Sequence, residues 1–280
     1  MNLLKVARWQ FHQSVLSKQF LVMAFFIPLI FALVALGIAW AKGSDPAAGG
    51  GEPLPPFAIA VFLAILLFLG AFLSAVMTLY GVIREKGSRV VEIILSSVSA
   101  ADLLGGTILG LGLAGLLQVM IWVALAYFAG SRFVPISLSV LSPVQLVCYP
   151  ILFALGYLLI ASLYATVGAG MKDVHSGGAA GLVGMIPYAP MLFTVAIVEH
   201  PDATWIRAAS FFPPFTPAML MMRLAVTKIP WWEVAGALCI LATSVVLLMR
   251  FSARVFETAI LMYGKNATLK ELWRWGVRRR

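Results

Sequence analysis

Charged residues are scarce in this sequence: Asp, Glu, Lys and Arg make up only 11% of the chain, while 62% of it is hydrophobic. A water-soluble fold of 280 residues cannot bury that much apolar surface, so several segments must lie in a lipid bilayer. The net charge of +9 does not come from a separate basic domain, because the basic residues flank apolar runs. Membrane orientation explains this charge better than nucleic-acid binding, and we expect no nucleic-acid partner.

Cysteine and histidine are also rare. Cys148 and Cys239 stand alone in apolar runs and form no C-x-x-C pair, which argues against a disulfide framework or a metal site. None of the three histidines has a carboxylate or a cysteine at ligand spacing; His175 lies beside Asp173, where a solvated turn explains it better than a catalytic base. Since G-x-S-x-G and H-E-x-x-H are missing too, we predict no metal and no catalytic residue in this chain.

The sequence has no G-x-x-x-x-G-K-[ST] loop, so it cannot bind ATP by that route. Its apolar runs contain no ionisable residue in their interiors, whereas proton- or ion-driven secondary transporters usually carry such residues there. Any ATP-driven transport would therefore take its energy from a separate subunit. An ATP-independent channel or secondary transporter is the alternative.

Six long apolar runs predict six transmembrane helices. They cover residues 20–41, 57–83, 103–130, 144–170, 177–198 and 231–249. The first run is too long for the core of a signal peptide, and Pro187 and Pro190 should distort the fifth helix. The third run carries Gly106-x-x-x-Gly110, which lets helices approach closely, at a dimer seam or within one chain. The predicted fold class is an all-α integral membrane protein with its transmembrane domain at residues 20–257.

Basic segments flank this domain. In residues 1–19, Lys5, Arg8 and His12 recur at helical spacing, which predicts a helix lying in the membrane interface. Residues 258–280 form a basic tail in which Thr268-x-x-Glu271 can cap a last helix. Most of the 20 Lys and Arg residues fall on one side of the six-helix topology, so we expect a multi-pass protein of the cytoplasmic membrane with both termini in the cytoplasm.

A polar stretch, residues 84–102, separates the second and third apolar runs. Arg89, Glu92 and Ser96 recur in it at helical spacing, which predicts a short amphipathic helix on the membrane surface. Ser99-x-x-Asp102 then predicts a cap for the next apolar helix. This pattern fits either a solvated loop or a docking helix that takes mechanical force from a soluble partner.

The same stretch resembles the signature of ABC transporter type-2 permeases, and most closely that of the sodium-exporter-type branch. The resemblance is carried by Glu85-Lys86, by Val91-Glu92-Ile93-Ile94-Leu95-Ser96-Ser97-Val98-Ser99 and by Leu103-Leu104 through Ile108-Leu109-Gly110. It implies the membrane subunit of an ATP-driven exporter, a homodimer in lipid that works with two copies of a cytoplasmic ATPase subunit. ATP and Mg²⁺ would bind to that partner, and no cofactor to this chain.

The resemblance also implies roles for individual residues. Residues 84–102 would hold the coupling helix, and the ATPase contacts would be Glu85, Lys86, Arg89, Val91, Glu92, Ile94 and Leu95. Residues 199–230 would form re-entrant outer helices, and the candidate gate or path residues are Gln118, Pro187, Pro190, Pro213, Pro214 and Pro217. Gln118 alternatively makes a helix–helix hydrogen bond.

One departure bears on the substrate. Sodium-exporter-type permeases carry a large outer domain between the first two spans, where this chain has only the short loop of residues 42–56. The sodium substrate therefore does not carry over. A transport path lined by apolar and aromatic residues favours an amphipathic or apolar cargo such as a lipid, drug or peptide.

Overall fold

The computed structural model describes residues 2–18, 20–26, 28–30, 56–87, 98–133, 141–172, 185–260 and 267–277. These residues form helices joined by turns, and they contain no strand. The predicted all-α class is confirmed for this part of the chain.

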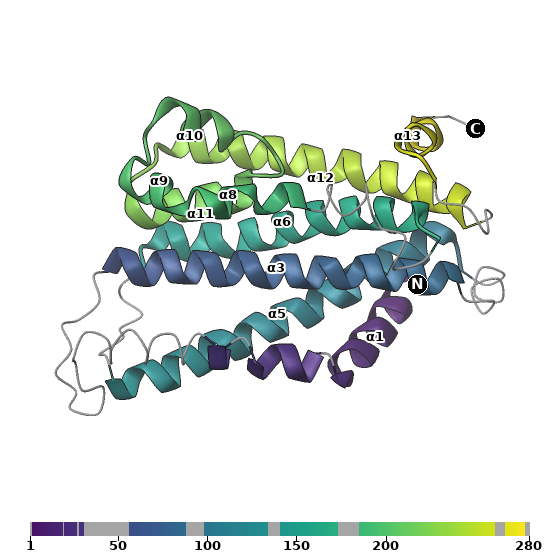
Figure 1. The fold of residues 1–280 in the computed structure, drawn as a ribbon, viewed down its shortest axis with the longest axis horizontal. Helices are drawn as coiled ribbons and strands as arrows, with labels where there is room; N and C mark the ends of the chain where they lie inside the picture. The colour runs from purple at the N-terminus through teal and green to yellow at the C-terminus, as the bar shows by residue number, and fades with distance from the viewer. Residues whose placement is uncertain are drawn as a thin grey trace.

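Four long apolar helices form the body of the molecule (Figure 1): α3 (Pro56–Gly87), α5 (Ala100–Phe133), α6 (Pro143–Gly170) and α12 (Trp231–Ala259). Each is long and apolar enough to cross a membrane. They confirm four of the six predicted spans. Helix α12 continues to Ala259, well past the predicted end of its span at residue 249, and the added turns include Arg250 and Arg254.

The chain bends just before the first predicted span, and the fifth predicted span is broken in its described part. Helix α1 (Asn2–Val15) is followed by the helical segment Phe20–Ile30, and the two axes are bent by 59°. Near Pro187 and Pro190 the chain forms a 3-10 turn, η2 (Ile186–Tyr188), and two short helices, α8 (Ala189–Leu192) and α9 (Thr194–Glu199). The distortion expected from these prolines is present. Residues 31–41 and 177–184 of these runs lie outside the described residues.

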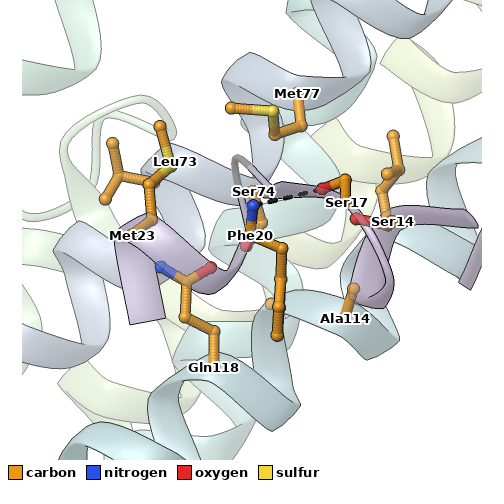
Figure 2. Close-up of a pocket in the computed structure, with 11 residues that line it drawn as sticks. Ser14, Ser17, Phe20, Met23, Leu73, Ser74, Met77, Ala114 and Gln118 are labelled. Atoms are coloured by element: carbon orange, nitrogen blue, oxygen red, sulfur yellow. Dashed lines mark hydrogen bonds between the residues drawn. The ribbon is translucent and has the colours of Figure 1, made fainter. Parts of the chain in front are cut away.

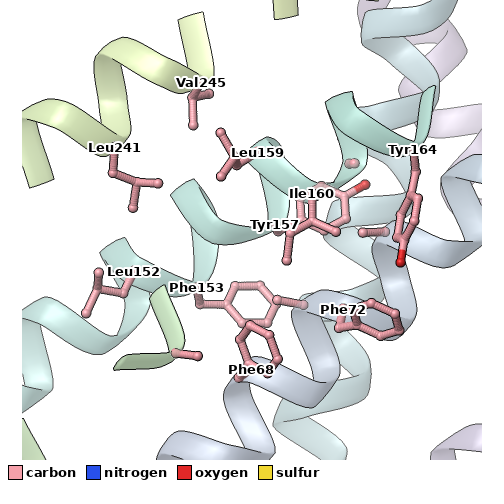
Figure 3. Close-up of a cluster of buried hydrophobic side chains, with 14 of the residues drawn as sticks. Phe68, Phe72, Leu152, Phe153, Tyr157, Leu159, Ile160, Tyr164, Leu241 and Val245 are labelled. Carbon is pink, nitrogen blue, oxygen red and sulfur yellow. The ribbon is translucent and has the colours of Figure 1, made fainter. Parts of the chain in front are cut away.

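Helix α6 is the centre of the bundle. It packs against α3, α5, α11 and α12, and Figure 1 shows it lying between α3 and α12. Its start is fixed by a capping box in which the Ser142 side chain and the Gln145 side chain satisfy each other's backbone N–H groups. Figure 3 shows part of the core around α6: Phe68 of α3 lies beside Phe153 of α6, and Leu241 of α12 faces α6 from the other side.

The stretch after α9 forms a compact helical segment at one end of the bundle. It comprises α10 (Thr204–Ala209) and α11 (Thr216–Val226), and α11 packs against both α3 and α6. Its Met219, Leu220, Met221 and Met222 side chains are all buried. Gly156 of α6 makes this approach possible, because a Cβ there would lie 2.8 Å from Pro217 Cβ. This stretch is packed structure and not a free loop.

Helix α13 (Leu269–Val277) packs against α12 at the opposite end of the bundle, the end at which the N-terminus also lies (Figure 1). Its predicted cap is confirmed: Thr268 N donates to Glu271 Oε2 at 2.8 Å, and Glu271 N donates to Thr268 Oγ1 at 3.3 Å. Leu272 packs on Gly170 at the end of α6, and Ala267 N donates to Gly170 O at 2.7 Å. The tail is thereby joined to the transmembrane core.

Candidate functional site

The predicted coupling residues are divided between the described and the undescribed parts of the chain. Arg89, Val91, Glu92, Ile94 and Leu95 lie outside the described residues. Glu85 and Lys86 lie in the last turn of α3, which ends at Gly87, and the chain is described again from Val98. The expected cap of α5 is confirmed, since Asp102 N donates to Ser99 Oγ at 3.0 Å. Both helices that flank the predicted coupling segment are therefore defined.

Glu85 joins three helices. Its Oε1 atom accepts hydrogen bonds from Gln10 Nε2 of α1 at 2.5 Å and from Thr107 Oγ1 of α5 at 3.0 Å. Gln10 Nε2 also donates to Thr107 Oγ1 at 3.2 Å. Gln10 and Thr107 are both buried, so these bonds are shielded from water. A hydrogen bond inside a protein is electrostatically stronger than one in water. This cluster of hydrogen bonds fixes the end of α3 to α1 and to the beginning of α5.

Lys86 joins α3 to a fourth helix. Its Nζ atom donates to Ala169 O at 2.7 Å and to Met171 O at 3.4 Å, at the C-terminus of α6. The side chain is only 7% exposed. A lysine is favourable in this position because the last carbonyls of a helix have no partner within the helix and carry partial negative charge.

These contacts give Glu85 and Lys86 a structural role within the chain. The structure shows that Glu85 Oε1 and Lys86 Nζ are bonded within the chain's own bundle, and their contact with an ATPase stays a prediction. They hold the end of α3 on α1, α5 and α6. Sequence reasoning missed this because a Glu-Lys pair at the end of an apolar helix is usually solvated.

We expect Lys86→Met to lower the free energy of unfolding by about 1.5 to 3 kcal/mol, the usual worth of hydrogen bonds to a charged group. Methionine keeps the packing of the lysine stem but leaves two carbonyls of α6 without this donor. Thermal unfolding of the purified full chain measures the loss. Lys228→Met is the matched control, because Lys228 is exposed at the other end of the molecule and its replacement should change stability by less than about 0.5 kcal/mol. Equal effects of the two substitutions would contradict the role of Lys86.

A second polar cluster lies at the opposite end, around Arg223 of α11. This arginine is fully buried; its Nη1 atom donates to Glu233 Oε1 at 2.5 Å and to Ser210 Oγ at 3.2 Å, and its Nε atom donates to Pro201 O at 2.8 Å. Glu233 Oε2 accepts from Arg207 Nη2 of α10 at 3.1 Å. The cluster ties α10, α11 and the start of α12 together.

Sequence reasoning did not assign a role to this pair. The sequence does mark both residues as unusual. Arg223 is the one charged residue in the apolar stretch 218–226, and Glu233 is the third residue of the last span. A charge in such a place has to be paired, since an isolated charge is strongly disfavoured away from water.

The candidate gate prolines lie near the same end. Pro187 and Pro190 are buried in η2 and α8, and α8 lies against α11. Pro213 and Pro214 are half-buried in the turn before α11, and Pro217 is buried in its first turn. Gln118 does not lie with them; it is buried on α5 beside Ser17 and Ser74. The structure therefore groups the prolines and leaves Gln118 apart.

The glycines of α5 pack within the chain. A Cβ on Gly106 would lie 2.6 Å from Val6 Cβ, and one on Gly110 would lie 2.5 Å from Ala7 O, so this face receives α1. Gly112 lies against Tyr157 of α6, and Gly115 lies against Ser74 of α3. Of the two possibilities for Gly106-x-x-x-Gly110, the structure supports intrachain packing.

Comparison with known proteins agrees with this helical membrane architecture. The family model described as "ABC-2 family transporter protein" matches residues 51–254, which is most of the chain. The chain belongs to the ABC-2 transporter family. The resemblance to type-2 permeases of ABC transporters is thus confirmed, and this ABC-2 transporter chain is a membrane component of a transport system.

Two uncharacterized proteins are similar to this chain. The ABC-2 transporter chain is 29% identical over 222 residues to the uncharacterized protein MJ1024 of Methanocaldococcus jannaschii, a match that covers 77% of this chain and 51% of that protein. It is 26% identical over 231 residues to the uncharacterized protein YhaP of Bacillus subtilis, covering 76% of this chain and 54% of that protein. The chain spans about half the length of these relatives.

Proposed function

We propose that this chain is the permease subunit of an ATP-driven exporter, which moves substrate outward across the cytoplasmic membrane when a separate ATPase subunit hydrolyses ATP. Family membership supports a role in membrane transport. The observation that carries the proposal is the anchoring of the coupling segment: the end of α3 is bonded to α1 and α5 through Glu85 and to α6 through Lys86.

This anchoring provides a route for force. The segment between α3 and α5 leaves one helix and enters the other within a short stretch of chain. Because Glu85 and Lys86 bond the base of that segment to α1, α5 and α6, a push on the segment moves four helices together. ATP binding by the partner would displace the coupling segments of two permease copies, and their bundles would rearrange to release cargo.

The charge distribution supports an orientation. At the coupling end the described residues include Arg84, Lys86, Lys172 and Lys270. At the other end lie Arg207, Arg223 and Lys228, and the two arginines are paired with Glu233. Positive charge is retained on the cytoplasmic side of membrane proteins, so the coupling end and both termini face the cytoplasm in this proposal.

The end of the bundle that carries α9, α10 and α11 would then face outward, and it has the properties expected of a gate. In the proposal, α9, α10 and α11 form the re-entrant segment, and the prolines around α11 supply breaks at which the backbone can bend without losing helix hydrogen bonds. The apolar and aromatic residues of the predicted spans favour an amphipathic or apolar cargo in this proposal.

A pull-down of the detergent-solubilised chain, followed by an ATPase assay of the bound fraction, tests the proposal. We expect an ABC ATPase subunit to be recovered, and Arg89→Glu to reduce its recovery at least tenfold, which corresponds to about 1.4 kcal/mol. The matched control is Lys228→Glu, the same charge reversal at the opposite end, which should leave recovery unchanged.

Two results would contradict it. One is undiminished ATPase binding and transport by the folded Arg89→Glu variant. The other is solute flux through liposomes that contain the chain alone, without ATP, which would favour a channel or secondary transporter.

A further inference from the structure

A small cavity lies where the N-terminal helix pair bends. Its walls come from the bend itself, from α3 and from α5, and the space open to the centre of a water molecule is about 20 Å³. Figure 2 shows the side chains that surround it. Phe20, Leu73 and Met77 form part of the apolar wall. The polar wall comprises Ser14, Ser17, Ser74 and Gln118.

Gln118 needs a partner in this cavity. Its side chain is only 5% exposed, and its Nε2 atom finds no hydrogen-bond partner among the described residues. An amide has two N–H donors, and a buried donor left without an acceptor is strongly unfavourable. Such groups in folded proteins are nearly always satisfied, by protein or by ordered water.

The two serines have hydrogen-bonding capacity left over. Ser17 Oγ accepts from Phe20 N at 3.1 Å, which leaves its own O–H hydrogen outside that bond (dashed in Figure 2). Ser74 Oγ donates to Gly70 O at 2.8 Å, which leaves its lone pairs outside that bond. One side chain can therefore donate further and the other can accept, from two different walls of the cavity.

We propose that this cavity binds one water molecule, which accepts a hydrogen bond from Gln118 Nε2 and joins it to Ser17 and Ser74. The available space exceeds the roughly 10 to 15 Å³ that one water requires, and it is too small for a larger ligand. The proposed water would have three polar partners, the usual number for a buried water.

The position of this water at the bend gives it a structural role. The chain bends by 59° between Leu3–Val15 and Phe20–Ile30, so the regular helix ladder is interrupted there. Breaks of this kind in membrane helices are satisfied by neighbouring helices, by serine or threonine hydroxyls and by ordered water. The bound water joins the bend to α3 and α5 and so fixes the angle at which α1 meets the bundle.

A double-mutant cycle on the full chain tests the water. Ser74→Ala and Gln118→Met should each lower the midpoint of thermal unfolding by about 2 to 4 °C, because each removes a partner of the bridging molecule. The double variant should lose clearly less than the sum, since one water accounts for both losses. An experimental map at a resolution that shows ordered waters should contain a density peak within hydrogen-bond distance of Gln118 Nε2.

Ser244→Ala is the matched control for the serine. Ser244 Oγ donates to Ile240 O at 2.8 Å, the same bond within its own helix that Ser74 makes, but it lies on α12 away from the cavity. This substitution should leave the midpoint unchanged. The inference is overturned if Gln118→Met raises the midpoint, as removal of an unpaired amide would, if the two losses are additive, or if the map shows an empty cavity.

Discussion

Replacing Glu233 with leucine should destabilise the protein by about 3 to 5 kcal/mol, the usual result of removing one partner from a buried ion pair. Leucine would leave the Arg223 guanidinium, which is fully buried, without its buried carboxylate partner. It would also release Arg207, whose bond to Glu233 Oε2 holds α10 against the start of α12. Chemical or thermal unfolding of the full chain in detergent measures the effect.

A second substitution should recover much of this loss. In the double variant Arg223→Met/Glu233→Leu both charges are removed, and apolar side chains of similar size fill the space, which is often neutral or stabilising for buried pairs. Ser210 Oγ loses only one of its contacts, because it also donates to Ile206 O at 2.8 Å. A double variant that is even less stable than Glu233→Leu would contradict the view that the unpaired charge causes the damage.

Asp202→Asn provides the control at the same site. Asp202 Oδ1 lies 3.6 Å from Arg223 Nη2, but the aspartate side chain is 69% exposed. Exposed ion pairs contribute less than about 1 kcal/mol, so this substitution should have a small effect. The difference between the two carboxylates separates the buried contact from the general charge around Arg223.

Gly110→Ala should destabilise the chain by about 1 to 3 kcal/mol, the range for inserting a methyl group into a close-packed site. The new Cβ would lie 2.5 Å from Ala7 O and 3.1 Å from Phe11 N, which are backbone atoms that cannot turn aside. Helix α1 must therefore move away from α5, and Gln10, which lies 2.8 Å from the same Cβ, must move with it. Its hydrogen bond to Glu85 is lost in that movement.

Gly81→Ala is the matched control for this prediction. A Cβ on Gly81 of α3 would lie 3.6 Å from Thr107 Cγ2, which is an ordinary contact. Alanine favours the helix over glycine by up to about 1 kcal/mol, so this variant should be as stable as the original or more so. Hydrogen exchange of residues 2–15, measured beside thermal unfolding, should rise for Gly110→Ala alone. If both alanine variants behave alike, the close approach of α1 and α5 is not what Gly110 provides.

Features that depend on neighbouring residues along the chain could be predicted from the sequence. The apolar runs of α3, α5, α6 and α12 exceed the thickness of a bilayer, and such runs have few alternatives to a helix in lipid. The cap at Ser99 and the capping box at Thr268 depend on residues only three positions apart. The broken helix at Pro187 and Pro190 follows from the missing proline N–H.

Features that depend on which helices lie together could not be predicted in this way. The partner of the Gly106–Gly110 face is α1, and the separation of about 100 residues between them leaves no local pattern. Glu85 and Lys86 have the composition of a solvated helix end, yet they are buried because Gln10, Thr107 and the end of α6 meet them there. The role of the segment beyond them stays a prediction, since residues 88–97 lie outside the described residues.

The contacts made by the last carbonyl groups of α6 restrict changes in the length of this helix. Ala169 O receives the ammonium group of Lys86, and the next carbonyl, Gly170 O, receives the N–H group of Ala267 from the tail. Adding or deleting one residue earlier in α6 would rotate both carbonyls by about 100° around the helix axis, since a turn takes about 3.6 residues. Both contacts would then be lost together. Insertions and deletions should therefore be tolerated in the loops on either side of α6 but not within it.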